Sequence, residues 1–165
     1  MFDALQRLSA GLSRGALYAS AFGLLGMTGL IGWQVFARKI LGAAPAWTEQ
    51  AALFLMLWFI LFAAAAGVRE GFHIRITLLE DSLGPQGARA LRLLAHLAVA
   101  AFGVAMAVSG GELAAATWTH MIPTLGLPRG AAYLPLSGAG ALIVLFALEH
   151  AWAELTGRKV AALWN

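Results

Sequence analysis

The chain has 165 residues, of which 61% are hydrophobic and only 12% are charged. This composition, with a mean hydropathy of +0.78, is far from that of a soluble domain and indicates that the chain lies in lipid. The sequence has no cysteine, which excludes disulfide frameworks, thiolate nucleophiles and cysteine-based zinc or iron–sulfur sites.

The first residues predict a short amphipathic N-terminal helix. Phe2, Leu5, Leu8 and Leu12 recur at helical spacing, while polar residues take most positions between them. An apolar stripe opposite a polar face is typical of a helix that lies in the membrane interface. An ordinary polar connector that happens to contain leucines is the alternative.

Four uncharged windows follow, at approximately 15–37, 50–68, 93–111 and 130–148. Each has at least 19 residues, and 19 helical residues reach about 28 Å, close to the hydrocarbon core of roughly 30 Å. The runs are continuously apolar rather than alternating, which disfavours barrel strands. We therefore expect an all-α integral membrane protein with four transmembrane helices in a single membrane domain, residues 1–165.

The segment between the second and third windows, approximately 75–92, predicts a cytoplasmic interfacial helix. Ile76, Leu79 and Leu83 share one helical face, and Gly84-Pro85 then breaks the helix before the third span begins.

Basic residues predict the orientation. Four spans would place eight Lys and Arg side chains on the side of the termini and only three on the other side, namely Arg38, Lys39 and Arg129. Because basic residues concentrate on the cytoplasmic side, both termini should be cytoplasmic. The small basic groups explain the net charge of +3 without nucleic acid binding.

Two local patterns mark helix packing and a helix start. Gly23, Gly26, Gly29 and Gly32 form a slowly drifting stripe on the first span, where another helix backbone could approach closely; simple tolerance of glycine in membrane helices explains it equally well. Thr48 should cap the second helix, with Glu49 favouring the positive end of its dipole.

The sequence holds no catalytic constellation, so an enzyme is not indicated. The windows contain no Asp, Glu, Lys or Arg, whereas transporters usually place ionisable groups or broken helices near the midplane. An autonomous exporter is therefore disfavoured. His96 and His150 fall near the same end of their helices, so a haem-binding or redox-linked membrane anchor is the alternative function.

The order of local motifs resembles the small membrane subunit (Q-type, DctQ-like) of tripartite ATP-independent periplasmic (TRAP) transporters. The first half of the pattern is a basic end to the first helix, Trp and Glu opening the second, and a small-residue end followed by a basic His-Ile turn, here Arg38, Trp47, Glu49, Ala63 to Gly67, Arg69, Gly71, His73 and Ile74. The second half is an outer loop and helix start, here Gly126-Leu127-Pro128 and Tyr133-Leu134-Pro135-Leu136.

This resemblance implies a scaffold in the bacterial inner membrane without a cofactor or metal of its own. Its partners would be a large membrane subunit that carries the substrate path and sodium sites, a periplasmic binding protein that delivers an organic anion, and membrane lipid. The candidate partner-interface residues are Gly23, Gly26, Gly29, Gly32, Arg38, Trp47, Glu49, Arg69, His73, Pro128, Tyr133 and Pro135.

The absence of cysteine makes the orientation directly testable. Ala43→Cys and Thr124→Cys should react with a membrane-impermeant maleimide added to intact spheroplasts, because positive-inside bias places both residues in the periplasm. Ser82→Cys and Thr156→Cys should react only after the membrane is opened. Labelling of the second pair in intact spheroplasts would invert the orientation.

Overall fold

The computed structural model describes residues 2–43, 45–71, 84–158 and 160. Its elements in chain order are α1 (Phe2–Ile40), α2 (Trp47–Glu70), α4 (Gly84–Ala116), β1 (Met121–Ile122), β2 (Leu127–Pro128), the 3-10 helix η1 (Arg129–Ala132) and α5 (Leu134–Thr156).

Four of these helical segments are long and apolar enough to cross a membrane, as the sequence predicts. The helices extend beyond the uncharged windows at most ends, because a helix continues into the interface until glycine or a turn stops it. Gly71 and Gly157 end α2 and α5 with positive φ angles of 72° and 67°. Glycine adopts this left-handed conformation without the steric penalty that a Cβ atom brings.

The predicted amphipathic N-terminal helix is not a separate element. Its residues form the first turns of α1, which runs without interruption from Phe2 to Ile40. Ser9 and Ser13 are fully buried there, whereas Leu8 is 60% exposed. The two serines of this segment therefore face the protein, where Arg69 and Glu70 of α2 are their hydrogen-bond partners, whereas Arg7 and Arg14 are exposed.

The predicted interfacial segment is only partly within the described residues. Residues 84–92 form the first turns of α4, which continues through the third apolar window, so they are not a separate element. Gly84, with a φ of 68°, starts the helix, and Pro85 follows in the first turn. Proline suits that position because the N–H it lacks would be unsatisfied there. Residues 75–83 lie outside the described residues.

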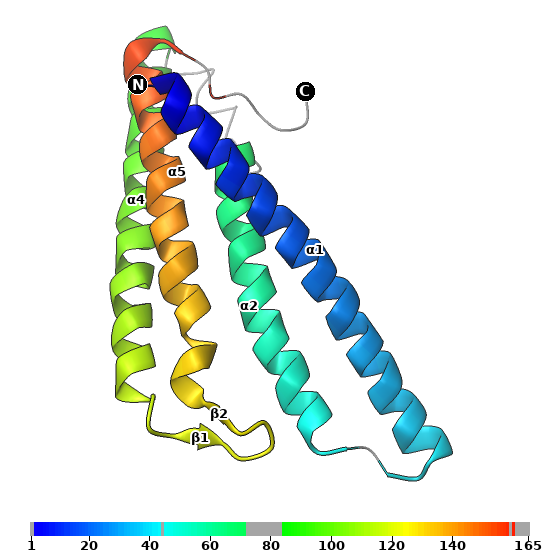
Figure 1. Cartoon of the computed structure of the whole chain (residues 1–165). Coiled ribbons are helices and arrows are strands. Elements are labelled where there is room, and N and C mark those ends of the chain that lie inside the picture. The colour runs from blue at the N-terminus through cyan, green and yellow to red at the C-terminus, as the bar shows by residue number, and fades with distance from the viewer. Residues whose placement is uncertain (1, 44, 72–83, 159, 161–165) are drawn as a thin grey trace.

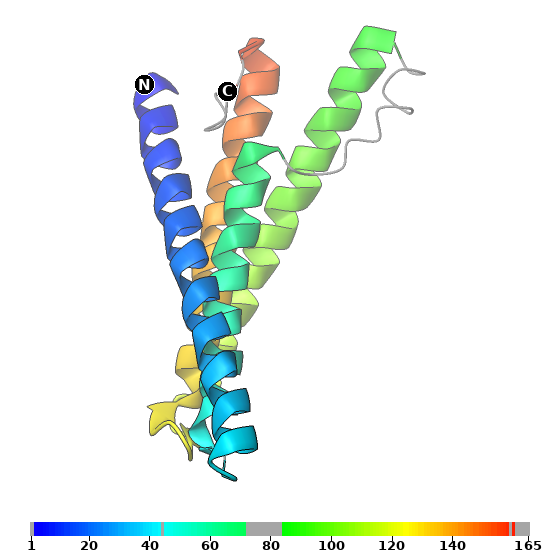
Figure 2. The same ribbon diagram turned by 90° about the vertical axis from the view of Figure 1, so that its right-hand side faces the viewer.

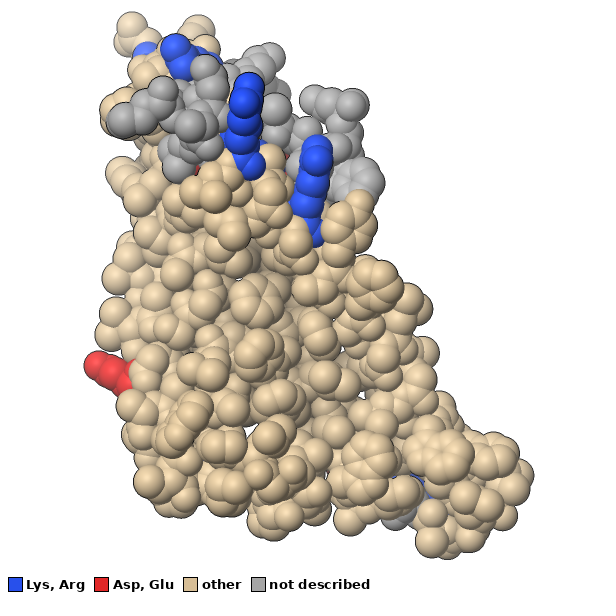
Figure 3. Space-filling model, viewed as in Figure 1, with Lys and Arg blue, Asp and Glu red and all other residues tan. Residues whose placement is uncertain are grey.

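The four long helices pack in the spatial order α4, α5, α2, α1 (Figure 1). The start of α1, the end of α2, the start of α4 and the end of α5 lie at one end of the molecule, here called the terminal end. The β-hairpin and the α1–α2 connection lie at the opposite end, here called the hairpin end (Figures 1 and 2). On the face drawn in Figure 3, blue basic side chains gather toward the terminal end, most of the surface below them is tan, and one red acidic side chain projects from the left edge.

The closest helix contact is between α4 and α5, and it depends on glycine. A Cβ atom on Gly140 would lie 2.5 Å from the Ala107 nitrogen, and one on Gly110 would lie 2.5 Å from the Ser137 nitrogen. The Ser137 hydroxyl donates a hydrogen bond to the Ala107 carbonyl at 2.8 Å. In lipid, where apolar side chains gain little by leaving apolar solvent, such backbone approach is a main source of helix association.

The apolar core lies between α2 and α5. Ala65 and Val68 of α2 pack with Ala139, Ile143 and Phe146 of α5, and all five side chains are buried. Phe146 and Ala139 are completely inaccessible. This core makes α2 and α5 the centre of the bundle, with α1 and α4 on either side.

A short antiparallel hairpin connects α4 to η1 and α5. Met121 pairs with Pro128 and Ile122 with Leu127, and Gly126, with a φ of 64°, completes the turn. The Arg129 backbone N–H donates to the His120 carbonyl at 2.6 Å and closes the base of the hairpin. The hairpin thereby fixes where η1 begins.

Gly110→Ala should destabilise the protein, because the new methyl group would overlap the Ser137 backbone. Overpacking of this kind costs about 1–3 kcal/mol, more than the alanine gains from its helix propensity. Thermal unfolding in detergent, followed by circular dichroism, measures the change.

Gly111→Ala is the matched control, since its methyl group would lie 3.8 Å from the Ser137 hydroxyl, an ordinary contact. Equal melting temperatures for the two variants would show that α4 and α5 do not approach as closely as described.

Candidate functional site

A buried ionic cluster joins α2 to α5 at the terminal end. Arg69 of α2 and Glu149 of α5 are 2% and 1% exposed. The Arg69 Nε lies 3.7 Å from a Glu149 carboxylate oxygen, and the Arg69 Nη1 lies 3.3 Å from the carboxylate of Glu70. Charges removed from water in this way are stable only when they are paired, so the cluster couples the positions of the two helices.

Polar side chains from α1 complete this cluster. The Arg69 Nε donates to the Ser9 hydroxyl at 3.3 Å, and the Ser13 hydroxyl donates to Glu70 at 3.2 Å. The His150 Nε2 lies 2.8 Å from the Arg69 carbonyl, and because a carbonyl only accepts, the imidazole must donate. Three helices, α1, α2 and α5, therefore meet at one polar site.

A second, more exposed polar contact joins α4 to α5 at the same end. The Arg92 Nε lies 2.8 Å from the Glu154 carboxylate, with both side chains about a quarter exposed. Arg89 donates to the Leu155 carbonyl at 2.8 Å. These interactions hold the terminal ends of α4 and α5 together where the two helices no longer pack through glycine.

The two histidines that suggest a haem site do lie together, but in a geometry that does not suit a haem. The rings of His96 and His150 stack face to face, with centroids 5.2 Å apart and an angle of 15° between the planes. An axial histidine points a ring nitrogen at the iron, so two axial rings lie end to end across the macrocycle. His150 also directs its Nε2 at the Arg69 carbonyl, so the pair braces α4 and α2 against α5.

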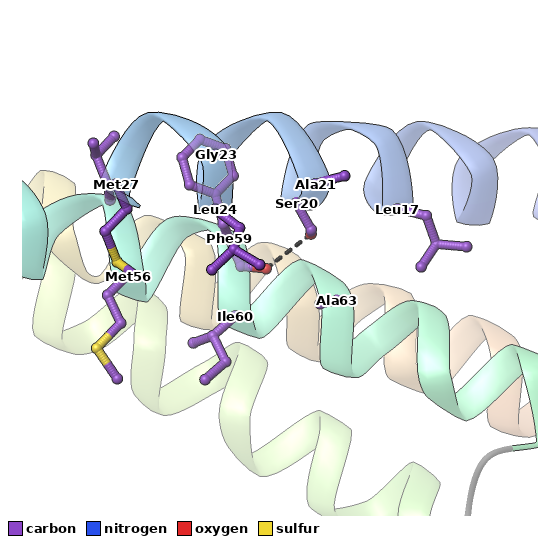
Figure 4. A pocket seen from close by; sticks show the side chains of 11 residues that line it. Leu17, Ser20, Ala21, Gly23, Leu24, Met27, Met56, Phe59, Ile60 and Ala63 are labelled. Carbon is purple, nitrogen blue, oxygen red and sulfur yellow. Dashed lines mark hydrogen bonds between the residues drawn. The ribbon is translucent and has the colours of Figure 1, made fainter. Parts of the chain in front are cut away.

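The glycine stripe of α1 divides into two parts. Gly23 is buried, and a Cβ atom there would overlap the ring of Phe59 on α2. One turn away, the Ser20 hydroxyl donates to the Phe59 carbonyl at 2.8 Å (Figure 4). A Cβ atom at Gly26, Gly29 or Gly32 would meet nothing within 4 Å. Of the four glycines in the stripe, only Gly23 therefore lies against another helix of this chain.

Beside Gly23, an apolar groove of about 430 Å³ runs between α1 and α2. Leu17, Leu24 and Met27 of α1 line one side, and Met56 and Ile60 line the other (Figure 4). The groove has almost no polar lining apart from Ser20, whose hydroxyl is already bonded to α2. It can hold an apolar chain, but it offers no group for catalysis or for binding an ion.

The outward face of α1 contains the three open glycines. Four large side chains share this helical face with the glycines, because their spacings of four, three and eight residues are close to whole turns of the helix. They are Tyr18, Phe22, Leu25 and Trp33, which are 64%, 73%, 69% and 47% exposed. We call this surface, residues 18, 22, 25, 26, 29, 32 and 33, the open glycine face. Large apolar side chains thus flank a strip where the helix backbone is accessible.

The candidate residues at the hairpin end lie apart from the buried cluster. Arg38, Trp47 and Glu49 are exposed. The prediction that Thr48 caps α2 is wrong, because its hydroxyl donates to the Pro45 carbonyl at 2.7 Å and the helix already begins at Trp47. Glu49 lies in the first turn of α2, where a carboxylate favours the helix dipole.

The remaining candidates belong to the hairpin and the start of α5. Pro128 ends β2, Tyr133 precedes α5, and Pro135 is buried in its first turn. Tyr133 is half-buried and lines a pocket beside α2. His73 lies outside the described residues. The candidates therefore fall into separate groups rather than into one site.

Sequence reasoning missed Glu149 as the partner of Arg69. Each residue directly follows an apolar window. Arg69 follows the window that ends at position 68, Glu149 follows the one that ends at position 148, and both windows end on the same side of the membrane. That coincidence of depth was the available signal. The sequence alone could not show that α2 and α5 are neighbours, so it could not pair the charges.

Among the described residues, no group of three or more His, Asp or Glu side chains is arranged to hold a metal ion. Four helices long and apolar enough to span a membrane, joined by small-residue contacts and polar interactions, define a small polytopic membrane protein. Residues 27–157 match the family described as tripartite ATP-independent periplasmic transporters, DctQ component, and the chain belongs to this family.

The chain is also similar to the sialic acid TRAP transporter small permease protein SiaQ of Vibrio cholerae. The two are 26% identical over 117 residues, which cover 71% of this chain and 68% of the relative. The protein is thus a small TRAP transporter subunit, a transport component of the inner membrane rather than an enzyme.

Arg69→Met should strongly destabilise the chain, because it leaves the buried Glu149 carboxylate without its cation. Breaking a buried ion pair costs about 3–5 kcal/mol. Arg69→Met combined with Glu149→Leu should recover much of that loss. Unfolding in mixed micelles, monitored by tryptophan fluorescence, gives the free energies.

Arg92→Met tests the same substitution in the partly exposed pair with Glu154. It should cost about 1 kcal/mol or less, as exposed ion pairs do. If Arg92→Met were as harmful as Arg69→Met, burial of the Arg69 cluster would not be what stabilises the bundle.

Proposed function

We propose that this chain is the scaffold subunit of a TRAP transporter. It supports the large membrane subunit during sodium-driven uptake of an organic anion that a periplasmic binding protein delivers. Family membership supports the assignment to such a transporter, and the relative's name specifies one organic anion, sialic acid. The observation that carries the scaffold role is the open glycine face of α1.

The spans of this chain suit a support better than a substrate path. Their uncharged windows contain no ionisable acid or base. The helices that the structure describes within them are continuous, whereas coupled transporters coordinate sodium and anions with broken helices or buried charges near the midplane. Substrate and sodium therefore bind to the other subunits.

The open glycine face is the surface that we assign to the large subunit. Gly26, Gly29 and Gly32 present accessible backbone, and Phe22 and Trp33 flank them with large exposed side chains. A partner helix can approach closely at the glycines while the aromatic rings pack along its sides. Gly23 contacts Phe59 of α2 within the chain, whereas a Cβ atom at any of the three open glycines would meet nothing within 4 Å, so these three remain available to a partner.

The polar cluster at the terminal end would keep this face in a fixed position. Ser9 and Ser13 tie α1 to Arg69 and Glu70 of α2, and Arg69 is in turn paired with Glu149 of α5. A scaffold must resist the motion of its partner, and interactions that bridge three helices at one point oppose their sliding. The cluster therefore supports a static rather than a moving role.

The basic asymmetry supports cytoplasmic termini. Among the described residues, Arg7, Arg14, Arg69, Arg89, Arg92 and Arg158 belong to the terminal end, against Arg38, Lys39 and Arg129 at the hairpin end. This orientation directs the hairpin toward the periplasm, where the binding protein would deliver its substrate.

Reconstitution tests the proposal. Liposomes with this chain alone should show no sodium-driven uptake of radiolabelled sialic acid or other organic anion, whereas the large subunit, the binding protein and this chain together should show it. Gly29→Leu should reduce both uptake and co-purification of the large subunit, because a leucine side chain blocks close helix approach.

Gly23→Leu and Val35→Leu are the comparisons. The first should impair folding of the isolated chain, since Gly23 contacts Phe59, and the second replaces one exposed apolar side chain by another. Sodium-driven uptake by this chain alone would refute the scaffold role. Normal assembly of Gly29→Leu would remove the open glycine face from the interface.

A further inference from the structure

A pocket of about 560 Å³ lies at the hairpin end, between the first turns of α2 and the segment that leads into α5. The hairpin projects beside the start of α2 in both ribbon views (Figures 1 and 2). In the part of the chain that the structure describes, the hydrogen bonds and ion pairs given above between the four long helices come from residues that do not line this pocket. It is also distinct from the open glycine face, because its lining comes from α2, the hairpin and η1 and includes no residue of α1.

The lining changes from polar to apolar along α2. Gln50, Thr124, Arg129 and Tyr133 supply polar groups, while Leu53 and Leu57 continue the wall into the membrane-spanning part of α2. Gln50, Leu53 and Leu57 share one helical face because they are three and four residues apart. Leu57 lies about 10 Å deeper than Gln50 at 1.5 Å per residue, so the pocket extends from the interface into the hydrocarbon layer.

Arg129 gives the polar end a positive charge. Its side chain is exposed at the pocket, and no salt bridge to it occurs among the described residues. Its backbone is fixed by the hydrogen bond to His120, so the guanidinium projects from an anchored position. A guanidinium offers several N–H donors in a planar fork, which matches the oxygens of a phosphate group.

We propose that this pocket binds an anionic phospholipid. The phosphodiester of the headgroup lies on Arg129, within reach of the polar groups of Gln50, Thr124 and Tyr133, and one acyl chain runs along Leu53 and Leu57. Leu53 and Leu57 are 52% and 41% exposed, so an acyl chain finds apolar surface directly beneath the cation. A free phosphate would use only the upper half of the pocket, and a soluble anion gains nothing from two leucines.

The test uses the full chain purified in detergent and titrated with phosphatidylglycerol or phosphatidylcholine, with bound lipids counted by native mass spectrometry. The first phosphatidylglycerol should bind about fivefold more tightly than phosphatidylcholine, the factor that one basic group gives near an anionic lipid. Arg129→Gln should abolish this preference, and Arg129→Lys should retain most of it because the charge remains.

Arg38→Gln is the matched control, since Arg38 is also a basic residue of the hairpin end but does not line the pocket. It should keep the preference, and millimolar inorganic phosphate should not displace the lipid. Equal binding of the two lipids by the unchanged chain would overturn the proposal. So would an equal loss in Arg38→Gln, or displacement by phosphate, which would indicate a site for free anions. Loss of the large subunit from Arg129→Gln with unaltered lipid binding would assign the pocket to a protein segment instead.

Discussion

Helices in this protein can associate firmly only where their backbones come close. In lipid, burial of leucine or phenylalanine against another helix replaces one apolar environment by another, so the hydrophobic effect contributes little between spans. Gly103, Gly110 and Gly140 remove the side chains that would keep α4 and α5 apart, and Gly23 does the same for α1 against Phe59 of α2. These positions set how closely α4 approaches α5 and how closely α1 approaches α2.

A second constraint acts where the spans leave the hydrocarbon layer. Arg69 and Glu149 lie just beyond their apolar windows. Both side chains are buried in the protein, but they lie near the membrane surface, where charged residues are tolerated, rather than in the middle of the bilayer. Close glycine contacts fix how near two helices approach, whereas the ionic cluster fixes how far one can slide past another. The two kinds of contact are complementary, and together they account for a bundle whose middle is uncharged and whose terminal end is braced.

The sequence predicted the four spans because continuous apolar runs of sufficient length have few other structures available to them. It could not predict that residues 2–13 continue into α1, since an interfacial helix and an extended span share the same periodicity, and only the burial of Ser9 and Ser13 distinguishes them. The candidate residues were named singly for the same reason. The role of Arg69 depends on its ion pair with Glu149. Gly23 packs against Phe59 whereas Gly29 stays open, and this difference depends on where Phe59 lies.

The unequal lengths of the helices have a mechanical consequence. The uncharged part of α1 between Arg14 and Arg38 has 23 residues, against 19 between Glu49 and Arg69 of α2, a difference of about 6 Å in helical length. Both must fit the same bilayer, and a longer apolar stretch is accommodated by tilting. α1 indeed runs obliquely across the other helices (Figure 1). Membrane thickness and the contact of Gly23 with Phe59 of α2 thus jointly set the inclination of α1, so a thinner bilayer would increase its tilt.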